Sequence, residues 1–270
     1  MRGIAGLLPA LVLLFAGSEA AATSPEPPAI VAELVADQAA LPPGGTMRLG
    51  VLLKVPAPWH IYWRNPGDSG LPTTIQIEAA SLSGGEIHFP IPEQFTQPGD
   101  LIGYGYSGDT LFVIPVAAPA DWVEGSKTVT VNVRWLACSN ICVPGRATLT
   151  GSVSAGSAAP SKHGAIFAEW ESRFPRETPP PFAAQVGVRP AGDGTTSIRI
   201  EADLPAGGRL LSWFPLPPKG VEIRAVTVEA REVNFNARSL PGSPPLTEAY
   251  GLLTWQEGDK KHGAYLRLPL

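Results

Sequence analysis

The sequence of 270 residues has a hydrophobic fraction of 44% and a formal net charge of −4. This composition describes a folded chain long enough for one large domain or two ordinary ones, and it excludes a disordered protein. The acidic balance and the absence of a Lys/Arg run argue against nucleic acid as a partner. The 30 Pro and 29 Gly punctuate short β-branched runs, which favours an all-β chain with many turns.

An apolar run near the N-terminus predicts an export signal. One Arg precedes the run from Ile4 to Ala16, and small residues follow it as far as Ala22. This order is typical of a secretory signal peptide, and we assign it to residues 1–22, with cleavage after Ala20 or Ala22. The alternative, an uncleaved membrane anchor, needs roughly 18 or more apolar residues. We therefore expect the mature protein in an exported, oxidising compartment, where disulfides are permitted.

Residues 29–155 form a first strand-rich block. Its alternating or β-branched runs include TMRLGVLLKV, TTIQIEA, TLFVIPV and KTVTVNVRWLA, and Pro/Gly turns separate them. Such runs predict short strands, and several of them in succession fit a β-sandwich.

Residues 156–181 differ from this block and predict a linker with a short helix. Apolar side chains recur there at helical spacing, namely Ile166, Phe167, Trp170 and Phe174. Ser161 is a candidate cap, and Pro175 ends the run. A stripe of this kind is more typical of packing against a neighbouring surface than of a binding site.

Residues 182–270 repeat the strand-rich pattern, with runs such as TTSIRIEADL, VEIRAVTVEAREVNF and GAYLRLPL. At about 90 residues, the block has the size of one immunoglobulin-like sandwich. It contains no cysteine and no cluster of catalytic residue types. The sequence therefore predicts an all-β protein with two immunoglobulin-like β-sandwich domains joined by the linker, and it places any chemistry in the first domain.

Cys138 and Cys142 are the only cysteines in the chain. They bridge each other, remain thiols or hold a metal, since no third cysteine exists. A bridge that closes so short a loop removes little entropy from the unfolded chain, roughly 2 kcal/mol. Structural disulfides usually join distant segments, and tight loops tend to make a disulfide easier to reduce. The spacing therefore favours a redox-active pair over a structural disulfide.

The residues around the cysteines predict a strand that ends in a turn. TVTVNVRWLA runs directly into Cys138, and SNI and PG have turn composition. Arg134 and Arg146 are close enough in sequence to favour a thiolate. A thiolate here supports attack on a partner's disulfide through a mixed disulfide.

Three motifs in order carry a family resemblance: PWHIYWRNPGDSGLPT at 58–73, YGYSGDTLFVIPV at 104–116 and WLACSNICVPG at 135–145. Together they resemble the N-terminal periplasmic domain of the DsbD and ScsB transmembrane thiol:disulfide reductases, most closely the ScsB-like branch. That branch is similar in having two immunoglobulin-like modules before its membrane part, so the resemblance covers nearly the whole mature chain. It implies a periplasmic location.

The resemblance also implies partners. It points to a protein that passes electrons from a membrane-embedded thiol:disulfide reductase to oxidised periplasmic thioredoxin-fold proteins, without a bound cofactor or metal. Full-length family members continue into membrane and thioredoxin-like domains, whereas this sequence has neither, nor a CxxC motif of its own. Either the electron donor is a separate polypeptide, or the module has lost its relay and serves another role.

By the same resemblance, Cys138 and Cys142 perform the exchange. Analogy with the family makes Cys142 the nucleophile and Cys138 the resolving thiol. The family shields its cysteines with a cap loop, and the matching stretch is LIGYGYS at 101–107, whose glycines permit opening. Tyr104 or Tyr106 is the aromatic residue expected to cover the disulfide.

The motif at 58–73 has a functional and a structural interpretation. In the first, the cysteine pocket is lined by Trp59, His60, Tyr62 and Trp63, and Asp68 tunes a thiol or accepts a proton. In the second, alternating aromatics pack the sandwich core and NPGDSG is a turn. We favour the core for Trp59 and Trp63, and both interpretations stay open for the other three residues.

Two other classes of function remain open. A copper or zinc carrier would bind its metal with the two cysteines and a histidine, although the four histidines are scattered along the chain. A non-enzymatic binding or assembly module would use the disulfide only as a structural bridge. Reversible reduction by a mild dithiol distinguishes redox function from a structural bridge, and stoichiometric metal would identify a carrier.

Overall fold

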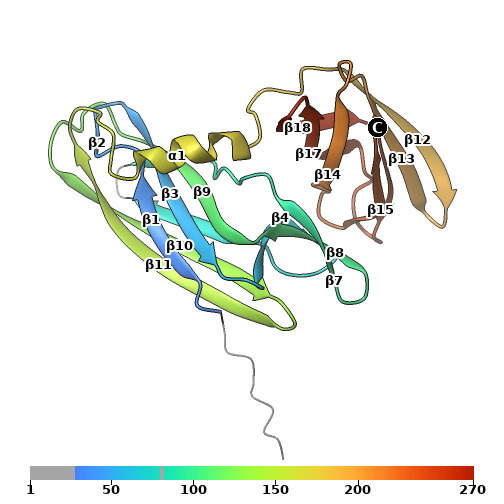
Figure 1. Ribbon diagram of the computed structural model, residues 1–270, viewed down its shortest axis with the longest axis horizontal. Helices are drawn as coiled ribbons and strands as arrows, with labels where there is room; N and C mark the ends of the chain where they lie inside the picture. Colours follow the sequence, from blue (N-terminus) through green and yellow to red (C-terminus); the bar gives the residue numbers. More distant parts are fainter. Residues whose placement is uncertain (1–27, 80–81) are drawn as a thin grey trace, which may run out of the picture.

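The computed structural model describes residues 28–79 and 82–270, so the predicted signal peptide at 1–22 lies outside the described residues. Figure 1 shows two β-sheet lobes side by side, with a short helix lying along the first. The prediction of an all-β protein with two sandwiches and a short helix is confirmed. No helix within the described ranges has the length and hydropathy needed to cross a bilayer.

The first sandwich consists of two sheets. Their strand orders are β1-β3-β9-β6 and β2-β11-β10-β4-β8-β7, and β5 pairs with the free part of β10. All pairs are antiparallel except β2 with β11. The strands are β1 (Val31–Ala36), β2 (Ala40–Leu41), β3 (Thr46–Val55), β4 (His60–Gly67), β5 (Thr74–Ala79), β6 (Ser83–Gly84), β7 (Glu93–Gln97), β8 (Leu101–Tyr106), β9 (Gly108–Ala117), β10 (Ser126–Cys138) and β11 (Cys142–Ala155).

The core of this sandwich follows from alternation along its strands. In β10, Val129, Val131 and Val133 are buried, whereas Thr130 and Asn132 between them are half-buried. Successive side chains of a strand point to opposite faces of the sheet, so the three valines share the face turned to the core. The other face of β10 is therefore available to carry functional groups.

Strand β3 is buried on both faces, which explains its nearly continuous apolar run. Val51 belongs to the core between the two sheets, whereas Leu52 packs on the outer face with Phe167 and Trp170. These two aromatics come from the linker, which forms α1 (Gly164–Trp170) and a 3₁₀ turn, η1 (Glu171–Arg173). The prediction that the linker's apolar stripe serves packing is confirmed.

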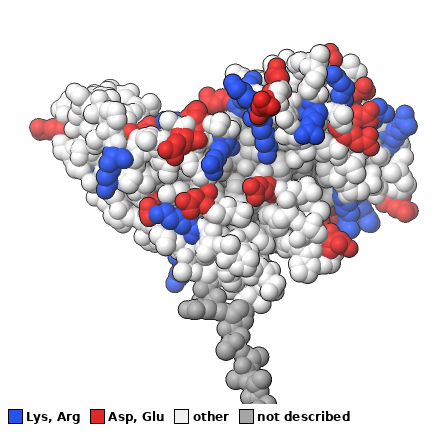
Figure 2. All heavy atoms as spheres, viewed as in Figure 1, with Lys and Arg blue, Asp and Glu red and all other residues white. Residues whose placement is uncertain are grey.

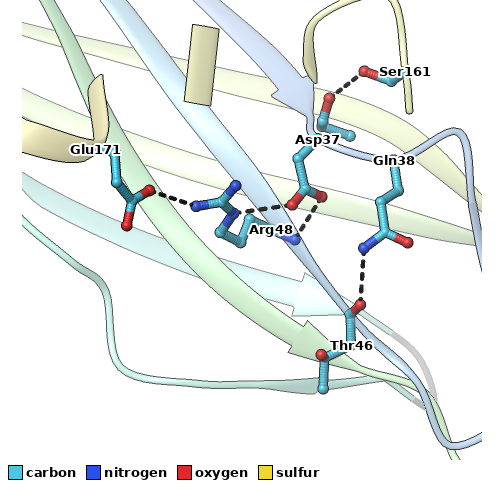
Figure 3. A network of polar contacts seen from close by, with 7 residues as sticks. Asp37, Gln38, Thr46, Arg48, Ser161 and Glu171 are labelled. Carbon is cyan, nitrogen blue, oxygen red and sulfur yellow. Dashed lines mark hydrogen bonds and ion pairs between the residues drawn. The ribbon is translucent and has the colours of Figure 1, made fainter. Parts of the chain in front are cut away.

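A polar network fixes the linker to the first sandwich (Figure 3). Arg48 forms ion pairs with Asp37 at 2.9 Å and with Glu171 of η1 at 3.0 Å. Ser161 was the expected helix cap, but its hydroxyl donates to the carbonyl of Ala36 and accepts from the amide of His163. The helix begins after His163 without a side-chain cap, because Ser161 instead closes the preceding turn.

The second sandwich also has two sheets, with strand orders β12-β13-β16-β15 and β14-β17-β18. Its separate core includes Trp213, Phe235 and Trp255. The strands are β12 (Ala184–Gly192), β13 (Thr195–Ala202), β14 (Arg209–Pro215), β15 (Val221–Glu229), β16 (Glu232–Ser239), β17 (Glu248–Glu257) and β18 (Lys260–Pro269).

The two sandwiches share apolar contacts. Phe214 of β14 is fully buried and packs edge-on against Trp63 of β4 and Tyr104 of β8, with ring centroids 5.9 and 5.3 Å apart. Beside this ring, the Asn65 side-chain amide donates to the carbonyl of Pro215 at 2.6 Å. Phe214 therefore belongs to the first core although it lies in a strand of the second sandwich.

Surface charges contribute less to the fold. Figure 2 shows acidic and basic side chains interspersed over one face of the molecule. Ion pairs such as Arg267 with Glu248, at 2.8 Å, join exposed or partly exposed groups. Such surface pairs contribute only about 0–1 kcal/mol each. The apolar cores are therefore the main source of stability.

Candidate redox site

The two cysteines lie at the end of the longest hairpin. β10 and β11 pair from Ser126 with Ser154 to Cys138 with Cys142, and a disulfide joins the two cysteines. Their Cα atoms are 4.1 Å apart, and the Ser139 amide donates to the carbonyl of Ile141 to close the turn. Residues directly opposite each other in an antiparallel pair are close enough for such a bond. The predicted strand and turn at the cysteines are thus confirmed.

The environments of the two cysteines differ. Cys138 is 2% exposed because β10 lies inside the sheet, with β4 on one side and β11 on the other. Cys142 is exposed, since β11 has no other described strand beside it at this end and meets β2 only at its far end. A partner molecule can therefore approach Cys142 but not Cys138.

Cys138 lies directly opposite His60, the first residue of β4. The His60 ring contacts Phe95 of β7, with centroids 4.1 Å apart, and Tyr62, with centroids 5.3 Å apart. Directly opposite residues project from the same face of a sheet. His60, Tyr62 and Phe95 thus form an aromatic cluster on the disulfide face of the sheet, and burial lowers the pKa of His60 within it.

Phe95 reaches this cluster because β8, the strand between β7 and β4, has glycines on the disulfide face of the sheet. Phe95 lies opposite Gly103 of β8, and Tyr62 lies opposite Gly105. A Cβ atom at Gly103 would lie only 2.3 Å from Cε2 of Phe95. The Phe95 ring therefore occupies the space that the glycine leaves. Phe95 was not predicted from the sequence, in which its only signal is its position shortly before the GYGY stretch.

Polar contacts hold the ring of Tyr62 in place. Its hydroxyl donates to Oε1 of Gln97 at 3.2 Å, and the Ser69 hydroxyl donates to the same oxygen at 3.0 Å. Burial raises the pKa of Tyr62. Trp59 and Trp63 are buried in the core, as the structural interpretation predicted. The motif at 58–73 therefore supplies both core residues and residues on the disulfide face.

Tyr104 and Tyr106 do not lie on the disulfide face. The stretch predicted as a cap loop forms strand β8, in which Tyr106 lies opposite Ile61 and Ile61 lies opposite Ala137. These residues share the face opposite to Cys138, because neighbouring positions of a strand alternate. The register therefore corrects the expectation that Tyr104 or Tyr106 covers the disulfide.

Both tyrosines serve the core. The Tyr106 hydroxyl donates to the carbonyl of Pro90 at 2.8 Å, and its ring packs edge-on against Phe112. Burial, together with the nearby Asp68 carboxylate, raises the pKa of Tyr104 to about 12.

Replacing Tyr104 by phenylalanine should therefore change how stability depends on alkaline pH. The pKa of this group is higher in the folded state than its ordinary value of 10.0. The un-ionised Tyr104 contributes roughly 2–3 kcal/mol to the free energy of unfolding. This contribution is complete below pH 10 and is lost as the pH rises towards 12. Denaturant unfolding at a series of pH values should show a smaller loss for Tyr104→Phe than for the wild type. Equal losses in the two proteins would contradict the assignment.

Asp68 is not brought to the cysteines. It follows the last residue of β4, whereas His60 at the first residue lies opposite Cys138. Its amide donates to the carbonyl of Ile102 at 2.8 Å, and its Oδ2 accepts from the Ile102 amide at 2.8 Å. This pair of bonds fixes the turn to β8. The structure therefore supports a turn-forming role for Asp68 rather than proton transfer to a thiol.

Arg134 and Arg146 lie opposite each other in the hairpin and are exposed. They share the face of the disulfide, but they are four residues along the strands from the cysteines, roughly 13 Å at 3.3 Å per residue. Exposed charges at this distance are largely screened at physiological salt. The two arginines therefore have little effect on a thiolate at either cysteine, contrary to the expectation from sequence proximity.

A cleft between the two sandwiches lies away from the disulfide. It has a volume of about 830 Å³ and lies between the linker, the turn from β8 to β9 and the turn from β17 to β18. Its walls include neither cysteine. Among the described residues, no group of three or more His, Cys, Asp or Glu side chains is arranged to hold a metal ion. Thiol exchange requires an accessible sulfur rather than an enclosed pocket, and Cys142 meets that requirement.

The chain was compared with protein families, curated proteins and solved structures. Residues 30–153 match the family described as "Thiol:disulfide interchange protein DsbD, N-terminal". The chain is also similar to the crystal structure of the N-terminal periplasmic domain of ScsB from Proteus mirabilis, with 15% identity and a TM-score of 0.64. That match covers 89% of this chain and 93% of the other, and it shows a shared fold. No curated protein matches the chain.

Proposed function

We propose that the protein is a thiol:disulfide interchange module acting through Cys138 and Cys142, because residues 30–153 match the model of the DsbD N-terminal domain family. One observation carries the proposal. The only disulfide of the described chain closes the end of a hairpin, with one cysteine exposed and the other buried. This asymmetry suits an exchange reaction, in which one sulfur meets the partner and the second sulfur completes the reaction.

Exposure supports distinct roles for the two cysteines. In the reduced protein, the Cys142 thiolate attacks a disulfide of the partner, forms a mixed disulfide and releases one partner thiolate. Cys138 then attacks the Cys142 sulfur, so that the internal disulfide forms and the second partner sulfur leaves as a thiolate. The module is oxidised and the partner is reduced by two electrons. Cys142 is the nucleophile because it is the accessible sulfur, and Cys138 is the resolving thiol.

The proposal includes a location, an electron donor and an electron acceptor. We place the protein in the periplasm, exported by the signal peptide at residues 1–22, and the similar ScsB structure is described as a periplasmic domain. A membrane-embedded thiol:disulfide reductase supplies the electrons. Oxidised periplasmic proteins of the thioredoxin fold accept them.

The reduction potential of the cysteine pair tests the proposal. Mature protein equilibrated in glutathione or dithiothreitol buffers should give a potential of roughly −270 to −120 mV, the range of known exchange proteins. Alkylation of the free thiols, followed by mass spectrometry, measures the reduced fraction. The Cys138→Ser variant has no internal disulfide and provides the control for the alkylation.

A different result would support the alternative function. A potential well below about −300 mV is typical of structural disulfides. Such a value, or a pair that is reduced only when the protein unfolds, would make the bridge structural. The protein would then be a binding or assembly module.

A further inference from the structure

The residue opposite the buried cysteine is a histidine. Cys138 and His60 form the last pair between β10 and β4, so their side chains project from the same face at the same level. Directly opposite residues have Cβ atoms about 4.5–5.5 Å apart. An imidazole at that distance is within reach of a sulfur at Cys138.

One nitrogen of this histidine has no partner. Nε2 of His60 is buried, and no group among the described residues forms a hydrogen bond with it. Buried polar atoms in folded proteins are nearly always hydrogen-bonded, so an exception needs an explanation. Sulfurs in a disulfide have no proton to donate. Reduction gives Cys138 a thiol proton, so a hydrogen-bond donor then lies directly opposite His60 in the sheet.

The exchange reaction needs a proton acceptor at Cys138. The thiolate is the reactive form of cysteine, and burial in apolar surroundings disfavours it. We propose that His60 is the general base for the resolving thiol and accepts the Cys138 proton as its sulfur attacks Cys142. This inference rests on the proposed function, because it assigns a residue to its second step.

The step is balanced. Cys138 loses its proton to His60, and its sulfur forms a bond with the Cys142 sulfur. The mixed disulfide between Cys142 and the partner breaks, and the partner's sulfur leaves with the electron pair. His60 then returns the proton to the partner thiolate or to water. No further oxidant or reductant is required.

The groups around His60 leave it free for this role. Its ring contacts Tyr62 of its own strand and Phe95 of β7, Cys138 of β10 lies opposite it, and Glu93 of β7 is on the same face of the sheet. The Tyr62 hydroxyl is bound to Gln97, and the Glu93 carboxylate accepts from Ser107 at 3.3 Å. Burial lowers the pKa of His60, so the ring is neutral and able to accept a proton at neutral pH.

Ellman's reagent separates the two steps of the reaction. Reduced protein should release thionitrobenzoate in two phases, the first as Cys142 forms the mixed disulfide and the second as Cys138 resolves it. In His60→Gln, we expect the first phase to keep its rate and the second to slow by about tenfold or more at neutral pH, the low end of general-base effects. Stopped-flow absorbance measures both phases.

The pH profile distinguishes a base from a packing residue. In the wild type, the second phase should keep most of its rate down to pH 6.5, since burial lowers the pKa of His60 from that value and the ring becomes protonated only at lower pH. In His60→Gln, it should fall about tenfold for each pH unit below the ordinary thiol pKa of about 8.5. Added imidazole should restore the second phase in His60→Ala. Circular dichroism verifies that both variants are folded.

A matched control is His88→Gln. His88 lies in the first sandwich but pairs with Val113 in the other sheet, so both phases should keep their wild-type rates. If the wild type shows two phases and His60→Gln has an unchanged second phase, the role of His60 is refuted and the proposed function still stands. The absence of both phases in the wild type would instead overturn the proposed function.

Discussion

Replacing Cys142 by serine should almost abolish the reaction with external disulfides, whereas replacing Cys138 by serine should stop the reaction at the mixed disulfide. In Cys142→Ser, the remaining thiol is the buried Cys138, which a partner cannot approach. We expect its rate to fall on the order of a hundredfold, because exchange depends on access to the attacking sulfur. In Cys138→Ser, the exposed Cys142 still attacks but nothing resolves the product.

Glutathione disulfide is a sufficient probe for this prediction. After incubation and acid quenching, mass spectrometry should show Cys138→Ser as a stable glutathione adduct and Cys142→Ser as mainly unmodified. The double variant provides the background. Equal modification of the two single variants would contradict the assignment of roles, and modification of Cys142→Ser alone would reverse it.

The local part of the site was predictable from the sequence. The two cysteines are close along the chain, and the run of alternating valines before them fixes a strand that ends at Cys138. Turn residues between the cysteines then place Cys142 opposite Cys138. Each of these steps depends on neighbouring residues, so local patterns were sufficient.

The long-range part of the site was not predictable in this way. His60 meets Cys138 only because β4 pairs with the end of β10, and no local pattern encodes that register. The tyrosines of β8 show the consequence. A shift of one residue moves every side chain of a strand to the other face. Tyr104 and Tyr106 therefore lie in the expected segment but on the core face of the sheet, not on the disulfide face. Phe95 was missed for the same reason.

Proximity in the sequence was also a poor guide to the distance between the arginines and the cysteines. Arg146 is four residues from Cys142, which would be about one turn of a helix, but along a strand it is roughly 13 Å. Phe214 shows the opposite case. It lies far along the chain from Trp63, yet the rings are in contact. Its membership of the first core depends on how the two sandwiches pack.

This packing leads to the second large effect, at Phe214. Its ring is fully buried between Trp63 and Tyr104, so Phe214→Ala removes apolar contacts and leaves a cavity where the sandwiches meet. Buried Phe→Ala changes typically cost about 3–5 kcal/mol. We expect the wild type to unfold in a single transition, because the first core includes a side chain of the second sandwich. The variant should unfold in two transitions.

Phe235→Ala provides the matched control. Phe235 is as deeply buried, but it stacks on Trp213 inside the second core, where the first sandwich does not reach. This variant should lose a similar amount of stability and still unfold in a single transition at a lower midpoint. Calorimetry and denaturant titration followed by tryptophan fluorescence measure the transitions. One transition with the same midpoint in both variants would show that Phe214 does not couple the sandwiches.

The coupling also bears on the redox site. Trp63 and Tyr104 contact Phe214 and lie in β4 and β8, the strands that position His60 and leave space for Phe95. We expect the second sandwich to support these strands. Phe214→Ala should then slow the second phase of the reaction with Ellman's reagent and leave the first phase unchanged. Only the second phase, in which Cys138 resolves the mixed disulfide, depends on the pairing of β10 with β4. Phe235→Ala should alter neither phase. An unchanged second phase in Phe214→Ala would mean that the first sandwich holds its site without help from the second.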